Sequence, residues 1–368
     1  MLASFFIFPM LFKYIVLFLL IFINFKKNIY PRKILGIFLI ISLSITTSSR
    51  EYGFLSDDLN NYYAAYIELM YYGNVLDNEF FRVTEFILPL IYYVFSLMGI
   101  KSPIFLMFIE SVLLYLLFYI WLELLIKKYN LHYPNLLIAI SFLLISLYYP
   151  TQLTRQFLSV LMFMYIFVFD KTILKVIISL LALLTHTTSM LYIFLYIFGI
   201  FKNLKIKIIA SIASIVVIYI IANEIIFSAY PIEGYINYYL VNIDTKNFAF
   251  NERNLLLALL LLASFVYKGH PVFIKIKYYI VFFIVLYFAL SKYGLIIERT
   301  FLPLLSIYLG VLIFLALYNK FKILISLIIL VTMNHFLLEL KMDGILWNSF
   351  PIYGEPFYYI DKLGGQNK

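Results

Sequence analysis

Long apolar blocks follow one another along almost the whole chain, and short polar segments separate them. Within the blocks, apolar residues do not alternate with polar ones at the period of two that transmembrane barrel strands require. Blocks of this kind are typical of helices that cross a bilayer. The pattern therefore predicts an all-α fold, a single polytopic membrane domain over residues 1–368 with about 12 transmembrane helices.

One stretch, residues 148–186, is predicted to form a helical hairpin. Two apolar helices, at 156–169 and 172–185, flank a polar Asp-Lys pair. Arg155 opens the first helix and His186 follows the second, at nearly equal distances from that pair. At about 1.5 Å per residue, both lie roughly 23 Å from the turn. A guanidinium and an imidazole should therefore meet at one level, near one face of a ~30 Å hydrocarbon slab.

Lysines mark the segments expected on the cytoplasmic side. Basic residues follow the first expected span, residues 5–25, and further lysines lie between later apolar blocks. By the positive-inside rule, the larger external regions that this alternation leaves are loops at 49–102 and 223–252 and an aromatic C-terminal tail at 337–368. The apolar segment 86–100 is expected to be a juxtamembrane or re-entrant helix, because counting it as a span inverts the charge bias of every later loop.

The first external loop contains a second candidate helix, with different residues on its two faces. The apolar face comprises Leu59, Tyr62, Tyr63, Tyr66, Leu69 and Met70. The polar face comprises Asp58, Asn61, Ala65 and Glu68. Such a helix should lie on the membrane surface.

The composition narrows the class of protein further. Hydrophobic residues make up 64% of the chain, more than a soluble domain of 368 residues carries. The net charge of +9 reflects lysines in short loops, so nucleic acid is not an expected partner. The absence of cysteine excludes disulfides and thiolate metal sites. The first apolar run precedes its basic residues and lacks a small-residue cleavage motif, so a cleaved signal peptide is not expected.

Acidic residues and arginines are sorted to the external side of this topology. Of the 19 acidic residues 16 fall outside, and so do five of the six arginines: Arg50, Arg82, Arg155, Arg253 and Arg299. Charge bias explains lysines inside but gives no reason for arginines outside. Because a guanidinium presents a planar, bidentate fork to phosphate oxygens, the sorting predicts a diphosphate or polyanionic ligand at the outer leaflet.

Arg155 and His186 are the leading chemical candidates, and each has a plain structural alternative. Arg155, with Gln156 beside it, could contact a diphosphate or could snorkel to lipid headgroups. His186 lies in a polar Thr-His-Thr-Thr-Ser island and could be a general base, a donor to a leaving phosphate, or an ordinary helix-end residue. Asp57 and Asp58 could act in catalysis or, with the preceding serine, cap the next helix.

Other polar groups carry weaker signals. Glu123 should pair with Lys127 one turn later, and Glu110 is a weak functional candidate inside a span. Arg299 is either a second phosphate contact or half of an ion pair with the adjacent glutamate. The remaining histidines stand alone in the sequence: His132, His270 and His335. Because none has ligand spacing, no metal is expected.

The C-terminal tail is rich in aromatic residues, among them Trp347, Tyr353 and Tyr358. Rings that alternate with Asn, Ser and Glu suit stacking on sugars. Aromatic belts at membrane interfaces are the alternative explanation.

The order of these motifs resembles that of a known family. An acidic, aromatic segment (SDDLNNYYAAY) precedes Arg-Gln at the start of a span, and His-Thr-Thr-Ser follows one hairpin later. A late arginine and the aromatic tail complete the layout. It is similar to that of the EpsG-like and Wzy-type oligosaccharide repeat-unit polymerases, with Arg-Gln and the histidine island as the more specific parts. The first loop also looks like that of GT-C glycosyltransferases, where an Asp before juxtamembrane helices helps catalysis.

The resemblance implies an O-antigen or capsule/exopolysaccharide polymerase in the bacterial inner membrane, with its active site facing the exterior. Donor and acceptor would be undecaprenyl-diphosphate-linked oligosaccharides, in contact with membrane lipid. A chain-length regulator is a further candidate partner, and no cofactor is implied. The diphosphate would be held by Arg155, Gln156, Arg299, Arg82 and Arg253. Catalysis would fall to His186, Asp58 or Asp57, and sugars to Trp347, Tyr353 and Tyr358.

Other functions remain open at this point. They are a lipid-linked oligosaccharide flippase or transporter, a GT-C glycosyltransferase that uses a lipid monophosphate sugar, and an O-antigen ligase. A flippase should carry charges along a central passage and show an internal repeat. Here the charges gather at the outer face and no repeat is visible, which favours the polymerase.

Overall fold

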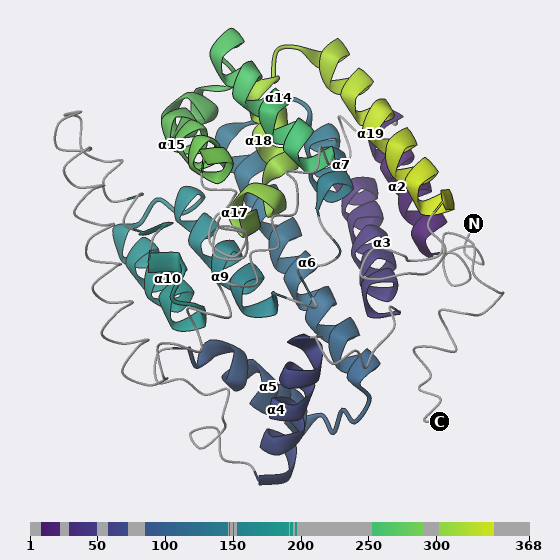
Figure 1. The fold of residues 1–368 in the computed structure, drawn as a ribbon, viewed down its shortest axis with the longest axis vertical. Helices are drawn as coiled ribbons and strands as arrows, with labels where there is room; N and C mark the ends of the chain where they lie inside the picture. The colour runs from purple at the N-terminus through teal and green to yellow at the C-terminus, as the bar shows by residue number, and fades with distance from the viewer. Residues whose placement is uncertain are drawn as a thin grey trace.

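The regular structure is helical throughout the part of the chain that the computed structural model describes (Figure 1). This part comprises residues 9–22, 29–49, 58–72, 85–145, 147, 150, 153–190, 192–193, 196, 252–289 and 302–341. The expected all-α fold is therefore confirmed for these residues.

The helices pack around a long central one, α6 (Figure 1). In chain order they are α2 (Pro9–Phe22), α3 (Ile29–Ser48), α4 (Asp58–Tyr72), α5 (Ile87–Leu97), α6 (Pro103–Tyr129), α7 (Pro134–Leu144), α9 (Thr154–Met164), the 3-10 turn η1 (Tyr165–Phe167), α10 (Thr172–Thr185), α14 (Glu252–Val266), α15 (Pro271–Ala289), α17 (Leu302–Ile307), α18 (Leu309–Ala316) and α19 (Phe321–Lys341).

Two of the described helices are long and apolar enough to cross a membrane, at Tyr30–Ser48 and Pro103–Tyr129. Further apolar helical stretches of the described residues have 10–17 residues, whereas a straight span needs about 20. The apolar run at residues 301–318 is interrupted at Tyr308, where α17 ends and α18 begins. The helical class and two span-length helices are thus established, and the full set of about 12 spans stays a prediction.

Several element boundaries differ from those expected. Helix α15 begins at Pro271, so Lys275 and Lys277 lie in its first two turns and not in a loop. A proline at the first helical position lacks only an N–H that would have no helical partner, which favours this earlier start. Helix α19 continues to Lys341, into the region 337–368 that was expected to be the C-terminal tail.

Local sequence explains both ends of α6. The Ser102 hydroxyl accepts a hydrogen bond from the Phe105 N–H at 3.4 Å, and Pro103 occupies the first turn. At the other end, the positive charges of Lys127 and Lys128 interact favourably with the negative end of the helix dipole. Asn130 then adopts the left-handed conformation, with φ of 48°, and ends the helix.

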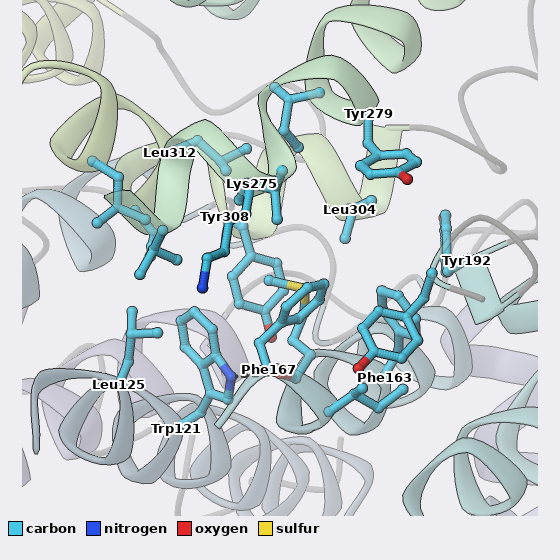
Figure 2. A pocket seen from close by; sticks show the side chains of 18 of the residues that line it. Trp121, Leu125, Phe163, Phe167, Tyr192, Lys275, Tyr279, Leu304, Tyr308 and Leu312 are labelled. Atoms are coloured by element: carbon cyan, nitrogen blue, oxygen red, sulfur yellow. Dashed lines mark hydrogen bonds between the residues drawn. The ribbon is translucent and has the colours of Figure 1, made fainter. Parts of the chain in front are cut away.

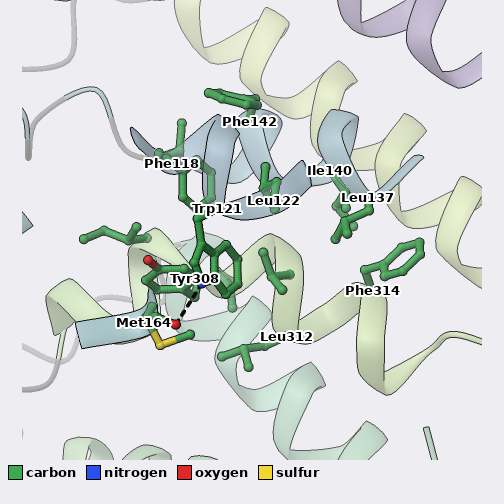
Figure 3. Close-up of a cluster of buried hydrophobic side chains, with 14 of the residues drawn as sticks. Phe118, Trp121, Leu122, Leu137, Ile140, Phe142, Met164, Tyr308, Leu312 and Phe314 are labelled. Atoms are coloured by element: carbon green, nitrogen blue, oxygen red, sulfur yellow. Dashed lines mark hydrogen bonds between the residues drawn. The ribbon is translucent and has the colours of Figure 1, made fainter. Parts of the chain in front are cut away.

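The main core is built around the fully buried Trp121 of α6 (Figure 3). Its indole N–H donates to the Met164 carbonyl of α9 at 2.8 Å, which satisfies its one polar group. Tyr308, at the break between α17 and α18, meets the indole edge-on with 4.8 Å between ring centroids. Phe118, one turn earlier on α6, stacks on the same indole. This one side chain therefore joins three separate regions of the sequence.

A second, smaller core lies between α4, α5 and the first part of α6. Tyr62, Tyr66 and Leu69 of α4 are buried there, as expected for the apolar face of that helix. Ala65 was expected on the polar face, but it is also buried, because a small side chain allows α4 to approach α5 closely. Helix α5 has only 11 residues, about 16 Å, which is too short to span.

Three loops and one turn meet at one end of the bundle, here called the lysine end: residues 130–133, 267–270, 317–320 and 168–171. The Tyr318 hydroxyl accepts a hydrogen bond from the His132 N–H at 2.9 Å, and the His270 ring lies 4.7 Å from the Tyr318 ring. His132 and His270 were expected to stand alone. The structure places both beside Tyr318, so this prediction is wrong. Lys128 forms an ion pair with Asp170 at 2.6 Å.

Glu123 also has a different partner from the one expected. It accepts two hydrogen bonds from Arg32 of α3, at 2.9 and 2.7 Å, and one from Tyr119 at 2.8 Å. The prediction of a pair with Lys127 on the same helix is wrong, because α3 packs along α6 and offers a bidentate guanidinium.

Replacing Gly310 by alanine should destabilise the protein. A Cβ at this position of α18 would lie 2.7 Å from the Ser141 Cα, so α18 and α7 would have to separate. Overpacking of this kind typically costs about 1–3 kcal/mol. Thermal unfolding of Gly310→Ala in detergent should show a lower midpoint, with Leu330→Ala, at an exposed α19 position, as the control. An unchanged midpoint for Gly310→Ala would mean that the two helices do not make this close contact.

The stability of the lysine end should fall as the pH is lowered. Burial, and then the neighbouring His132, lower the pKa of His270 below its ordinary value of 6.5. The unfolded chain therefore takes up a proton at higher pH than the folded chain, and stability is lost as the pH falls through the ordinary histidine range. Melting between about pH 8 and pH 5.5 should show a decrease that is smaller in His270→Gln. Equal decreases in both proteins would exclude His270 as a source.

Candidate functional site

The predicted hairpin is present and brings Arg155 and His186 to its open end. Helix α9 and η1 run into a turn at residues 168–171, and α10 returns alongside them (Figure 1). Arg155 is the second residue of α9, and His186 is the residue that follows α10. The Ser159 hydroxyl of α9 donates to the Ala182 carbonyl at 3.2 Å, which holds the two helices in register.

Glu85, which precedes α5, joins these two residues. Its carboxylate accepts a hydrogen bond from the Arg155 guanidinium at 2.8 Å, and its other oxygen lies 3.6 Å from Nδ1 of His186. That second oxygen also accepts from the backbone N–H of Thr187 at 3.0 Å and from its hydroxyl at 3.2 Å. The Glu85 side chain is only 5% exposed, so its charge is stabilised almost wholly by protein groups.

Glu85 was not among the site residues predicted from the sequence. It was counted among the external acidic residues and not singled out, since 70 residues separate it from Arg155. The available signal was its position, at the end of a polar loop directly before the apolar segment 86–100. When the helix that follows packs against the rest of the protein, an acidic residue directly before it is buried as well.

The surroundings of His186 indicate which ring nitrogen carries the proton. The Thr188 backbone N–H, which can only donate, lies 3.1 Å from Nδ1. In the neutral ring, Nδ1 is therefore the acceptor and Nε2 carries the hydrogen. In this arrangement His186 is suited to donate a hydrogen bond through Nε2, and less suited to accept a proton there.

Helix α5 packs against α10 and against α4, and both α4 and α5 lie next to the open end of the hairpin (Figure 1). The Arg155 guanidinium carbon lies 5.7 Å from the centre of the buried Tyr62 ring of α4, a cation–π distance. The Tyr66 hydroxyl donates to the Phe95 carbonyl of α5 at 3.2 Å, and Tyr63 donates to the Lys101 carbonyl. The expected first-loop helices thus pack against each other and over Arg155.

Two further buried groups lie near the cluster. Glu110 of α6 is 2% exposed, and its carboxylate oxygens receive no hydrogen bond from the described residues. It interacts electrostatically with Tyr92, which also interacts with Arg155. Gln156, expected to contact diphosphate, is 5% exposed, and no described residue donates to its Oε1.

The other predicted site residues are not brought together by the described part of the chain. Asp58 is the first residue of α4. Arg253 lies in the first turn of α14, which packs against α15 and α18. The rest lie outside the described residues: Asp57, Arg82, Arg299, Trp347, Tyr353 and Tyr358. Within the described ranges, no three His, Asp or Glu side chains are grouped to hold a metal ion.

No family model, curated protein or solved structure matches this chain.

The Glu85–Arg155 pair should make a measurable contribution to stability. Glu85→Gln removes the charge but keeps a similar shape, and leaves a partly buried guanidinium without its carboxylate. A double-mutant cycle of Glu85→Gln and Arg155→Gln, measured by unfolding in detergent, should give a coupling energy of about 1–3 kcal/mol.

Arg253→Gln is the matched control, because it removes an arginine of α14 that lies outside the cluster. It should show no coupling to Glu85→Gln. Additive effects of Glu85→Gln and Arg155→Gln would contradict the importance of the ion pair.

Proposed function

We propose that this chain is a membrane glycosyltransferase that joins undecaprenyl-diphosphate-linked oligosaccharide repeat units into a surface polysaccharide. The observation that carries the proposal is the meeting of Arg155 and His186 around Glu85, beneath α4 and α5. An arginine and a histidine at the end of apolar helices fit a ligand whose lipid lies in the bilayer and whose phosphates lie at its surface. The bacterial inner membrane and an outward-facing site are part of this proposal.

The reaction is a glycosyl transfer. A hydroxyl oxygen of the acceptor unit attacks the anomeric carbon of the donor chain, the bond from that carbon to the diphosphate oxygen breaks, and undecaprenyl diphosphate leaves. The hydroxyl proton passes to a base. The main demand is stabilisation of the negative charge that develops on the leaving diphosphate, which fixed cationic and hydrogen-bonding groups meet.

Arg155 is the residue proposed to contact the diphosphate. Its ion pair with Glu85 and its position over Tyr62 hold the guanidinium in one orientation before the ligand arrives. Such preorganisation avoids the cost of ordering a long side chain on binding. Arg253 at the start of α14, and Arg82 and Arg299, are proposed to supply further positive charge.

His186 is proposed to act through Nε2–H as a donor to a phosphate oxygen. This follows from the Thr188 N–H at Nδ1, which leaves the proton on the other nitrogen. Removal of the acceptor proton then falls to a carboxylate, for which Asp58 and Asp57 are the proposed residues. The aromatic tail residues Trp347, Tyr353 and Tyr358 are proposed to hold the sugars.

The proposal is tested by polymer length in a strain that lacks the gene and carries each variant. Arg155→Ala should abolish long chains, since loss of one preorganised charge-stabilising donor typically lowers the rate about 10²–10³-fold. Arg155→Lys should retain only a small part of the activity, because it keeps the charge but loses the bidentate fork. Lys322→Gln, at an exposed position near the lysine end, is the control and should leave the ladder unchanged. Normal polymer from Arg155→Ala at normal protein abundance would refute the assignment.

A pair of substitutions separates the two roles of His186. In His186→Gln the amide nitrogen can still donate near the position of Nε2, but it cannot take up a proton. If the histidine donates, Gln should retain clearly more polymerisation than Ala. Equal loss in both would instead indicate a general base.

A further inference from the structure

A cavity of about 300 Å³ lies on the side of α6 that faces α15 and α18. Its walls come from α6, α9 with η1, α10, α15, α17 and α18, and Figure 2 shows side chains converging on it. Aromatic and aliphatic residues dominate, including Trp121, Phe163, Tyr192, Phe283 and Tyr308. A volume at the lower end of the range for small-molecule sites suits part of one hydrocarbon chain.

Three lysines line this otherwise apolar cavity, and all come from the lysine end. Lys128 lies in the last turn of α6, Lys175 in the first turn of α10, and Lys275 in the second turn of α15. The helices on which they lie either end or begin at the lysine end, whereas Leu304 of α17 lies farther along the bundle. The cavity is therefore cationic at one end and apolar along its length.

Lys275 differs from the other two lysines in its partners. Lys128 is paired with Asp170 at 2.6 Å, and Lys175 donates to the Tyr196 hydroxyl at 3.3 Å. The ammonium of Lys275 points into the cavity toward Trp121 and Leu125 (Figure 2). No carboxylate within the described part of the chain forms an ion pair with it. A cation directed into a cavity of this composition is complementary to an anionic headgroup.

We propose that this cavity binds an anionic phospholipid, with its phosphate at Lys275 and an acyl chain between the aromatic walls. Basic pockets between membrane helices are a recognised way to hold such headgroups. The site is separate from the Arg155 cluster, because α9 and η1 carry the chain about 20 Å from Arg155 to the lysine end. The inference does not depend on the proposed polymerase activity.

Trp121 provides a local probe, because it lines the cavity and the chain has only one other tryptophan, Trp347. Trp347→Phe leaves Trp121 as the single fluorophore. This protein would be placed in nanodiscs that contain phosphatidylglycerol or phosphatidylcholine with brominated acyl chains, at matched mole fractions. Bromine quenches indole fluorescence only at short range, so quenching reports occupancy of the cavity.

Brominated phosphatidylglycerol should quench Trp121 at lower mole fraction than brominated phosphatidylcholine, by about fivefold, which corresponds to the attraction between one lysine and an anionic membrane lipid. Lys275→Gln should abolish most of this preference. Lys277→Gln is the matched control, since it removes a lysine from the same helix that does not line the cavity, and it should retain the preference.

Three outcomes would overturn the proposal. The first is equal quenching by the two lipids in the protein with the native lysines, a result that needs no lysine variant to fold. The second is equal loss of preference in Lys275→Gln and Lys277→Gln, which would indicate a general surface charge effect. The third is relief of quenching by an unlabelled polyprenyl phosphate but not by unlabelled phosphatidylglycerol, which would assign the cavity to a polyprenyl carrier.

Discussion

The burial of the Glu85 carboxylate constrains how α4, α5 and the α9–α10 hairpin are arranged. A carboxylate that is 5% exposed must be balanced by a nearby positive charge and by hydrogen-bond donors, or its desolvation would oppose folding. Arg155 supplies the charge and Thr187 supplies two donors. Because Glu85 leads directly into α5, this requirement fixes where α5 begins, and with it the position of α4 over the hairpin.

The need to balance the buried Glu85 charge also explains why the candidate site combines a carboxylate with an arginine and a histidine. The hairpin contributes one cation from the start of α9 and one imidazole from the end of α10, and neither helix contributes a carboxylate nearby. The carboxylate arrives from a different part of the chain. Its ion pair orients Arg155, while the Thr188 N–H selects the tautomer of His186. A fixed guanidinium and a directed N–H are what a leaving diphosphate requires.

Among the described residues, the ion pairs lie toward the two ends of the bundle. At one end lie Glu85, Arg155 and His186, and at the other the lysines and the rings around Tyr318. The cavity beside Trp121 extends from the lysine end into the apolar interior. Two chemically different sites, one proposed for a diphosphate and one for a phospholipid, can therefore exist without competing for the same charges.

Patterns within short stretches of sequence determined much of this structure. The apolar blocks determined the helices and the polar Asp170–Lys171 pair determined the hairpin turn. The spacing of Arg155 and His186 from that turn determined that they meet. Such features depend on neighbours one or two turns apart, which the chain itself keeps close.

Tertiary structure alone decided the pairings between distant segments. Glu85 with Arg155, Arg32 with Glu123, and His132 with His270 around Tyr318 each join helices or loops far apart in the sequence. Which residues pair depends on how the helices pack. Packing depends on the shapes of whole helix faces, and a local pattern of residues does not reveal those shapes.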